Sequence, residues 1–296
     1  MCMNAQIEHW DDIRIAYEVA KQGTLSGAAN YLNIHHTTVL RRVSALEKAL
    51  NTRLFHRHAR GYVPTEAGNN LFMVAANINE QLNNVAGKLH SSDEQISGQL
   101  VITTVDSFVE LLTPWFSEFC LLYPNIQFDL RVDTKRLRLD HGQAHIALRP
   151  GAQPKEPDYI AQNLMPLSLR LFAAKAYIDR NGTPRSMAEF SKHQFVSGSI
   201  DHSSPYFSWV NANVPSDNII YRASSVHAAT CAVKQGIGIG LASTWQVSPS
   251  SLVQLEGDWP QWDNHLWLVT HYLMHRTARV QAFSDFIKSK ISQLSV

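Results

Sequence analysis

The sequence has few cysteines and no excess of charge of either sign. Its three cysteines, Cys2, Cys120 and Cys231, form an odd set without CxxC spacing. This argues against a disulfide framework and indicates a reducing compartment. The formal net charge of +1 predicts no bulk attraction to nucleic acid or membranes. Any electrostatic footprint must therefore be local.

The chain also lacks long apolar segments. No stretch approaches the roughly 18 uninterrupted apolar residues of a membrane span. The opening segment, MCMNAQIEHWDD, contains acidic residues and no apolar core of signal-peptide length. We therefore expect a cytoplasmic protein with no membrane partner. Its 296 residues are enough for two or three domains, each with its own core.

Three short helices are predicted in the N-terminal part of the chain. Apolar residues repeat at helical spacing over residues 10–20, and Gly23 then ends the first helix. Thr24 or Ser26 caps a second, shorter helix. A third is predicted over residues 36–50, and the tight joint before it is typical of a helix-turn-helix.

A small hairpin and a long helix follow. Apolar residues flank a charged tip at Arg60 and Gly61, which predicts a wing beside the helices. The long helix begins near Glu66, and its apolar residues alternate steps of four and three. This heptad seam favours a dimer-forming coiled coil over a surface helix that packs on its own chain. The seam residues are Leu71, Ala75, Ile78, Leu82, Val85 and Leu89.

The pattern changes after a polar hinge at residues 91–98. Strands are predicted at residues 99–104 and 126–132, with a helix at residues 110–122 between them. Strands and helices then alternate to the end, which indicates a parallel α/β architecture. The predicted parts are a helical domain at residues 1–66, a linker helix with its hinge at residues 67–97, and an α/β domain at residues 98–296.

Basic residues gather between residues 35 and 60, where six Lys or Arg accompany one acidic residue. A charge run is usually a solvated face, but here residue types favour DNA binding. If Val39 and Val43 face the core, His36, Thr37 and Arg41 lie on the opposite side, where a recognition helix meets the major groove. Arg pairs bidentately with guanine, whereas Arg42, Arg53, Arg57 and Arg60 suit phosphate contacts. The candidate DNA contacts are Ser26, His35, His36, Thr37, Thr38, Arg41, Arg42, Arg53, Arg57 and Arg60.

Residues 10–68 resemble the winged helix-turn-helix of LysR-type transcriptional regulators. The matching segment is GTLSGAANYLNIHHTTVLRRVSALEKALNTRLFHRHARGYVPTEAG, in which the paired alanines, LEKAL, RLFHR and TEAG fall at the family's spacing. Two residues depart from the pattern. Leu40 stands where the family usually has serine, and His35 stands where a small hydroxyl caps the helix, so we expect a weaker cap and an unusual half-site.

Residues 98–290 resemble the effector-binding domain of the same family. The resemblance implies a multidomain protein, with an all-α winged helix-turn-helix and a long linker helix before a two-lobed α/β domain similar to type II periplasmic binding proteins. It also implies a homodimer or homotetramer that binds double-stranded operator DNA and contacts RNA polymerase. Its partner in the C-terminal domain would be a small-molecule effector, anionic or amino-acid-like.

A ligand cleft between the two lobes is implied by the same resemblance. Helix N-termini at such a cleft offer N–H groups to an anion. Asp106 would compete with an acidic ligand, so it either caps its helix or favours a ligand with an amine. The positions that match the cleft are Val105, Asp106, Ser107, Phe108, Thr134, Ser197, Ser199, Ser225, Val226 and His227.

Other chemistries have weaker support in the sequence. His141 and His145, like His271 and His275, are spaced i, i+4, but neither pair has an HExxH context, so we expect no metal. There is no GxSxG elbow, phosphate loop or Cys-His signature, so we expect no cofactor and no enzymatic activity. The alternative is a cytoplasmic small-molecule binding protein, or an enzyme, without a DNA-linked function.

Overall fold

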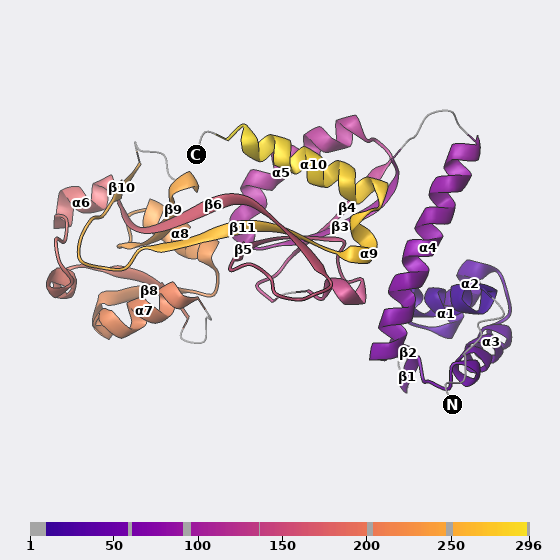
Figure 1. The fold of residues 1–296 in the computed structure, drawn as a ribbon. Helices are drawn as coiled ribbons and strands as arrows, with labels where there is room; N and C mark the ends of the chain where they lie inside the picture. Colours follow the sequence, from indigo (N-terminus) through magenta and orange to yellow (C-terminus); the bar gives the residue numbers. More distant parts are fainter. Residues whose placement is uncertain are drawn as a thin grey trace.

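The computed structural model joins a small helical domain to an elongated α/β domain through one long helix (Figure 1). It describes residues 10–58, 61–90, 96–135, 137–199, 204–246 and 251–294, apart from the side chains of residues 77, 80, 81, 83–90 and 246. Within these residues no helix is both long and apolar enough to cross a membrane.

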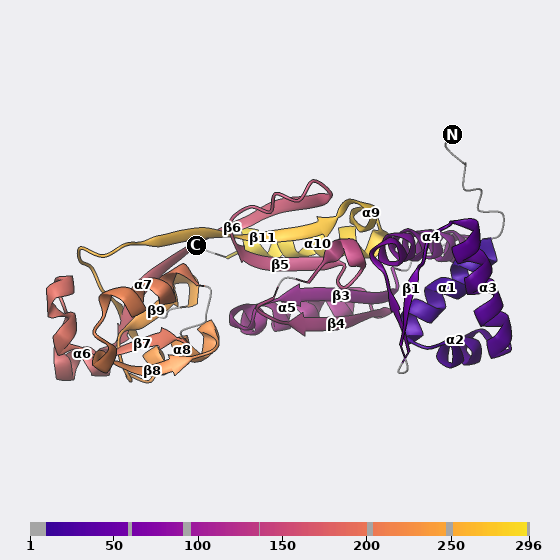
Figure 2. The ribbon, with the colours of Figure 1, turned by 90° about the horizontal axis from the view of Figure 1, so that it is seen from below.

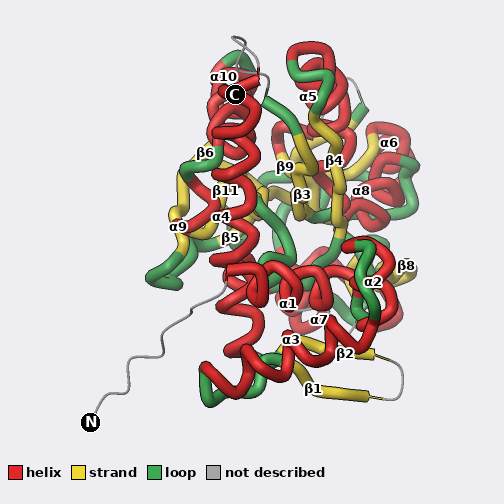
Figure 3. Tube along the Cα trace, turned by 90° about the vertical axis from the view of Figure 1, so that its right-hand side faces the viewer, coloured by secondary structure: helices red, strands yellow, loops and turns green. Residues whose placement is uncertain are grey.

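The helical domain contains the predicted helix-turn-helix and wing. Its elements are α1 (Trp10–Gln22), α2 (Leu25–Leu32), α3 (His36–Ala49), β1 (Phe55–His58) and β2 (Gly61–Pro64). Gly23 follows α1 with a φ of +70°, and the Thr24 hydroxyl caps α2 by accepting from the N–H of Gly27. Thr24, not Ser26, is therefore the cap. Figure 3 shows the hairpin projecting beside α3.

Two glycines allow the hairpin and the next helix to pack closely on this domain. Gly61 has a φ of +144°, and a Cβ there would lie 2.5 Å from the carbonyl oxygen of Gly23. The next N–H, that of Tyr62, donates to this same oxygen at 2.8 Å. A Cβ on Gly68 would lie 2.2 Å from the carbonyl oxygen of Leu54. Larger side chains at these positions would force the backbones apart.

The heptad seam of the long helix α4 (Glu66–His90) is partly buried and partly exposed. Phe72 and Ala75 are buried in the core of the helical domain, and Leu71 packs against that core. The first turns of the seam are thus covered by the helix's own chain. Leu82 is 53% exposed, as a partner-facing residue would be in one isolated chain. The predicted seam residues Val85 and Leu89 have side chains outside the described part.

The same helix also contacts the C-terminal domain, and Figure 1 shows it running alongside α9 (Tyr272–His275). Met73 of α4 is buried, and a Cβ on Gly142 would lie 3.6 Å from its Cγ. Gly142 directly follows the short helix η2 (Leu139–His141). One face of the linker helix is thereby occupied by the chain's own α/β domain.

A seven-stranded sheet runs through the C-terminal domain in the order β10-β6-β11-β5-β3-β4, with β9 paired to β6. A second sheet pairs β7 with β8. The strands are β3 (Gly98–Thr104), β4 (Ile126–Val132), β5 (Ile146–Gly151), β6 (Tyr159–Ala174), β7 (Phe195–Gly198), β8 (Ile219–Ala223), β9 (Gly240–Ser243), β10 (Leu252–Gln254) and β11 (Trp262–His271). The remaining helices are η1 (Asp106–Phe108), α5 (Val109–Leu122), α6 (Lys175–Asn181), η3 (Met187–Lys192), α7 (Pro205–Asn213), η4 (Ser216–Asn218), α8 (Val226–Lys234), η5 (Thr244–Gln246) and α10 (Ala278–Ser292).

The prediction of a parallel architecture is wrong for part of this domain. β3 is parallel to β4 and β5, and β7 is parallel to β8. In contrast, β11 is antiparallel to β5 and β6, and β6 is antiparallel to β9 and β10. The reason is that β6 leads the chain out of one lobe and β11 brings it back alongside, as Figure 1 shows. Neighbouring strands that leave and return in this way must be antiparallel.

The domain has two lobes, each with its own hydrophobic core, as predicted (Figure 2). In lobe 1, Phe116, Phe119 and Phe283 lie between α5, α10 and one face of the sheet. In lobe 2, buried residues such as Phe195 and Phe207 fill the space between β7 to β9 and helices α6 to α8. Two separate cores indicate two units that can shift relative to each other.

Candidate DNA-binding surface and ligand cleft

The third helix presents the polar face that its sequence predicted. Val39 and Val43 are fully buried, so they anchor α3 in the core. His36, Thr37 and Arg41 are exposed, and Thr38 is half-buried. A helix with 3.6 residues per turn places Thr37 and Arg41 opposite Val39 and Val43. His36 lies on the same side as the two valines, contrary to the prediction, and it is exposed at the first position of the helix.

His35 caps α3 through its ring, although the contact is long, so the predicted weaker cap stays a prediction. Its ring Nδ1 accepts from the N–H of Thr37 at 3.4 Å and lies 2.8 Å from the Thr37 hydroxyl oxygen. The imidazole thus supplies an acceptor for an N–H at the start of the helix, as a serine oxygen would. His35 is also exposed, and it directly precedes His36, one of the predicted base readers.

Arg42 has a structural partner that the sequence did not indicate. One of its guanidinium nitrogens lies 2.9 Å from a carboxylate oxygen of Asp12, which is largely buried on α1. This ion pair fastens α3 to α1. The phosphate contact predicted for Arg42 would have to use the donors that remain, because a guanidinium has five N–H groups.

Glu47 connects the recognition helix to the wing, and sequence reasoning missed it. One of its oxygens accepts from the N–H groups of Leu54 at 2.8 Å and Phe55 at 3.2 Å, while the other pairs with Arg57 at 2.9 Å. The only signal in the sequence was that Glu47 is the single acidic residue in the basic run. Arg57 also lies over the Tyr62 ring, 5.7 Å from its centroid, so its direction is set from two sides.

A basic hollow of about 480 Å³ opens between the end of α3 and the wing. Lys48, Arg53 and Arg57 line it with Glu47. Arg53 is exposed, as is Ser26 on α2, and Arg60 lies outside the described residues. The hollow places three of the chain's cations next to the exposed face of α3, which suits contacts to phosphate oxygens.

In the C-terminal domain, two helices that carry predicted cleft residues are in contact. The η1 helix of lobe 1, which follows Val105 and contains Asp106 and Ser107, contacts α8 of lobe 2. Phe108 is buried and stacks on Trp245 with ring centroids 5.3 Å apart. The hydroxyl of Ser225 caps α8 by accepting from the N–H of Ala228 at 3.0 Å.

The other predicted cleft residues differ in their availability. Ser197 is fully buried and its hydroxyl donates to the side-chain oxygen of Asn211 at 3.0 Å, so it stabilises lobe 2 and has no surface for a ligand. Ser199 and His227 are half-buried, as is Val226, which packs against the lobe 2 core. Thr134 is exposed just beyond β4, at the same sheet edge as Val105.

Three of the four paired histidines have roles within the fold. His145 is half-buried, its Nδ1 accepts from the N–H of Val101 at 3.0 Å, and desolvation of its ring lowers its pKa to about 3. His271 caps α9 by accepting from the N–H of Leu273, and His275 lies 3.0 Å from the Thr270 hydroxyl. Burial is the main cause that lowers the pKa of both. In the described part of the chain, no three or more His, Cys, Asp or Glu residues are grouped to hold a metal ion.

Comparison with known families decides the identity of these two domains. Residues 10–69 match the bacterial regulatory helix-turn-helix protein model of the lysR family. Residues 93–292 match the LysR substrate binding domain. The chain belongs to the LysR family of bacterial transcriptional regulators. Both matches follow the helical and two-lobed domains seen in the structure.

Relatives of this LysR-family chain carry the same kind of name. An HTH-type transcriptional regulator of Xanthomonas campestris pv. campestris is 34% identical over 192 residues, which is 62% of this chain and 54% of that protein. This match therefore spans about half the length of the relative. The transcriptional activator TtdR of Escherichia coli strain K12 is 24% identical, over 95% of this chain and 93% of that protein. These relatives are regulators, and the chain is accordingly not an enzyme.

Solved structures of LysR-family proteins share the fold. Full-length LysG from Corynebacterium glutamicum, with bound effector Arg, has a TM-score of 0.73 at 18% identity, covering 96% of this chain and 98% of that chain. The full-length virulence activator AphB of Vibrio cholerae has a TM-score of 0.54 at 24% identity, covering 95% of this chain and 99% of that chain. At these identities the likeness concerns the fold alone.

Proposed function

We propose that this LysR-family protein acts in the cytoplasm as an oligomer that binds operator DNA through α3 and the wing. The observation that carries the proposal is the exposure of Thr37 and Arg41 opposite the buried Val39 and Val43, with His36 exposed at the start of the same helix. Such a face is what a recognition helix presents to base edges in the major groove. The cations beside it would neutralise phosphates and make binding depend on salt.

Arg41 is the residue we expect to read a base. Arg41→Ala should weaken specific operator binding by about 1 to 3 kcal/mol, because a bidentate contact to guanine is lost. The measurement is a titration of a selected operator duplex at fixed salt, with a footprint at saturation. Arg185→Ala removes one exposed positive charge from the C-terminal domain and should leave affinity unchanged. An unchanged affinity and footprint for Arg41→Ala would reject its role as a base reader.

We also propose that the linker helices of two chains pair along the uncovered part of the seam. The 53% exposure of Leu82 supports this, because a leucine in the middle of a long helix is better buried against a partner. Two helix-turn-helix units joined in this way would meet half-sites about one helical turn apart.

Placing a charge on this seam should separate the chains. Leu82→Asp is expected to shift the protein to smaller species and to weaken operator binding, because two carboxylates would be buried without partners in the paired helix. Light scattering on the purified full chain measures the first effect. Asn70→Asp introduces the same charge at an exposed α4 position outside the seam and should leave the mass unchanged. If the mass of Leu82→Asp equals that of the wild type, the coiled-coil assignment is wrong.

The effector proposed for the cleft is small and anionic or amino-acid-like. The contact between η1 and α8 supports it, because Ser107 belongs to η1 and Ser225 caps α8. Asp106 in the first turn of η1 favours an amine group on the ligand. The bound effector Arg of LysG, an amino acid, is of this class. Regulation, including contact with RNA polymerase, requires that the effector bind two arrangements of the oligomer with different affinity.

A further inference from the structure

Lobe 1 contains a cavity of about 470 Å³ on the opposite face of the sheet from its main core. Successive residues of a strand point to opposite faces. On β11, Leu266 and Leu268 belong to the main core, whereas Trp267 and Val269 pack in or against a small second cluster that lines the cavity. No α-helix lies in the cavity wall, which consists of strand residues, η2 and the segment between β5 and β6. The cavity is distinct from the predicted cleft, because it includes neither η1 nor α8.

Two aromatic rings form fixed walls of this cavity. The indole N–H of Trp267 donates to the carbonyl oxygen of Gly151 at 2.9 Å. The Tyr159 hydroxyl donates to Asp140 at 3.1 Å and accepts from the N–H of Leu139, also at 3.1 Å. Both rings are therefore held in place before any ligand arrives. The other apolar lining is Leu137, Leu139, Ala147, Pro150, Ala152, Pro154, Pro157 and Val269.

The positive charges at the cavity are already bound by the protein itself. Arg138 pairs with Asp140. Arg149 donates to the carbonyl oxygens of Asp133 and Lys135 and to the hydroxyl of Thr103. These contacts direct both guanidinium groups toward protein oxygens.

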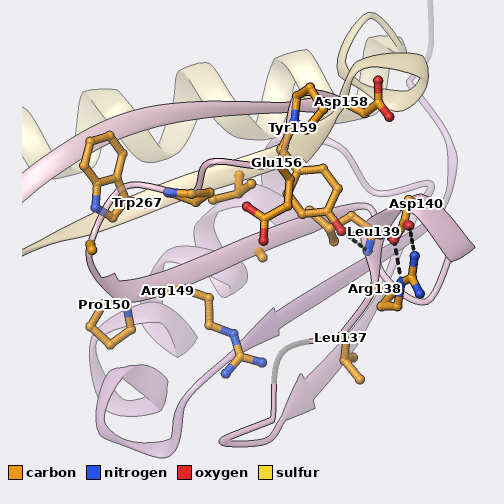
Figure 4. A pocket seen from close by; sticks show the side chains of 15 residues that line it. Leu137, Arg138, Leu139, Asp140, Arg149, Pro150, Glu156, Asp158, Tyr159 and Trp267 are labelled. Carbon is orange, nitrogen blue, oxygen red and sulfur yellow. Dashed lines mark hydrogen bonds and ion pairs between the residues drawn. The ribbon is translucent and has the colours of Figure 1, made fainter. Parts of the chain in front are cut away.

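The carboxylate of Glu156, by contrast, has no hydrogen-bond or ion-pair partner among the described residues. Figure 4 shows it between the indole of Trp267 and the ring of Tyr159, while the carboxylate of Asp158 points away from them. Glu156 is exposed, so it lies where a ligand would enter from solvent. Glu156 therefore offers a ligand a carboxylate that no described side chain already pairs with.

We propose that this cavity is a second small-molecule site, and that it takes an organic cation with an apolar body, such as an aryl-alkyl amine. Its volume is within the range of small-molecule pockets. The rings of Trp267 and Tyr159 line the cavity, and an aromatic face attracts a cation as well as an apolar group. Glu156 binds the ammonium group at the mouth, and the apolar body fills the space between the two rings. The site requires neither the predicted cleft nor DNA.

Two probes of similar shape and opposite charge test this site on the full chain by calorimetry: 2-phenylethylamine and phenylacetate. The amine should bind once per chain, and phenylacetate should bind at least about tenfold more weakly, because it meets a carboxylate instead of pairing with one. Absence of amine binding, or equal binding of the two probes, would overturn the proposal.

Matched variants locate the bound amine. Glu156→Gln keeps the shape of an exposed side chain and should weaken amine binding by about three- to fivefold, as loss of an exposed ion pair would, without weakening phenylacetate binding. Trp267→Leu should weaken amine binding by about tenfold through loss of the aromatic wall. Glu256→Gln, at an exposed position elsewhere in the same domain, is the control and should change neither. If Ser225→Ala weakens amine binding and Glu156→Gln does not, the amine lies in the cleft and the second site is rejected.

Discussion

Replacing Glu47 with alanine should lower the free energy of unfolding of the helical domain by about 3 kcal/mol. The carboxylate accepts from two N–H groups of buried residues at the start of β1, those of Leu54 and Phe55, and both would lose their acceptor. Hydrogen bonds to a charged group contribute about 1.5 to 3 kcal/mol each. A buried N–H that loses its acceptor also keeps the free-energy cost of its removal from water. Loss of the Arg57 ion pair, which is half-exposed, adds little.

The effect should be local, so it is best measured by amide hydrogen exchange of the full chain. Peptides covering residues 51–58 should exchange much faster in Glu47→Ala, while peptides from α5 and α10 should not change. Glu47→Gln is the matched control, because its carbonyl oxygen can still accept from the two N–H groups. It should keep most of the protection and lose only the charge paired with Arg57. Equal protection in Glu47→Ala and the wild type would show that the carboxylate does not hold the wing.

The second large effect concerns pH, because the half-buried ring of His145 is held in its neutral form. Burial, and then Arg279 and Arg131, lower its pKa from 6.5 to about 3. Below pH 6.5, the pKa of this histidine in the unfolded chain, the unfolded state binds a proton at His145 and the folded state does not. The free energy of unfolding therefore falls as the pH falls. Between about pH 6.5 and pH 4 this should cost lobe 1 on the order of 3 kcal/mol. Above that window His145 contributes no pH dependence.

A variant of His145 that keeps the hydrogen bond but cannot be protonated tests whether this residue causes the loss of stability in acid. His145→Asn offers a side-chain oxygen to the N–H of Val101, in place of Nδ1, and cannot take up a proton in this range. It should be less stable near neutral pH, since a ring is lost from a packed site, but its urea midpoint should fall less steeply on acidification. If wild type and His145→Asn lose stability in parallel between pH 6.5 and pH 4, other groups cause the acid sensitivity.

Much of the helical domain could be predicted because its signals are local. Gly23 ends α1 and Thr24 caps α2 through contacts within four residues, and the apolar period of α3 placed Val39 and Val43 in the core. The same period put Arg41 on the exposed face. The atom that makes the His35 cap, Nδ1 of the ring, is seen only in the structure.

Pairings between distant residues could not be predicted in the same way. The direction of β6 and β11 depends on where the chain returns about a hundred residues later, and alternation of strands and helices carries no information on that return. The partner of Arg42 is Asp12, thirty positions earlier, and the partners of Glu47 lie beyond the end of its helix. Ser197 matched the cleft by position, but only packing shows that it is buried beside Asn211.

The sequence by itself determined that this is a LysR-family regulator with a recognition helix, a wing, a linker helix and a two-lobed C-terminal domain. It did so because helix periods, caps and family motifs are read from neighbouring positions. Only the tertiary structure decided which arginines are held by carboxylates, how much of the linker seam is already covered, and where lobe 1 is hollow. Trp267 is far in the sequence from Glu156 and Tyr159, and it shares a cavity with them only because β11 lies beside β5 and β6 in the folded sheet.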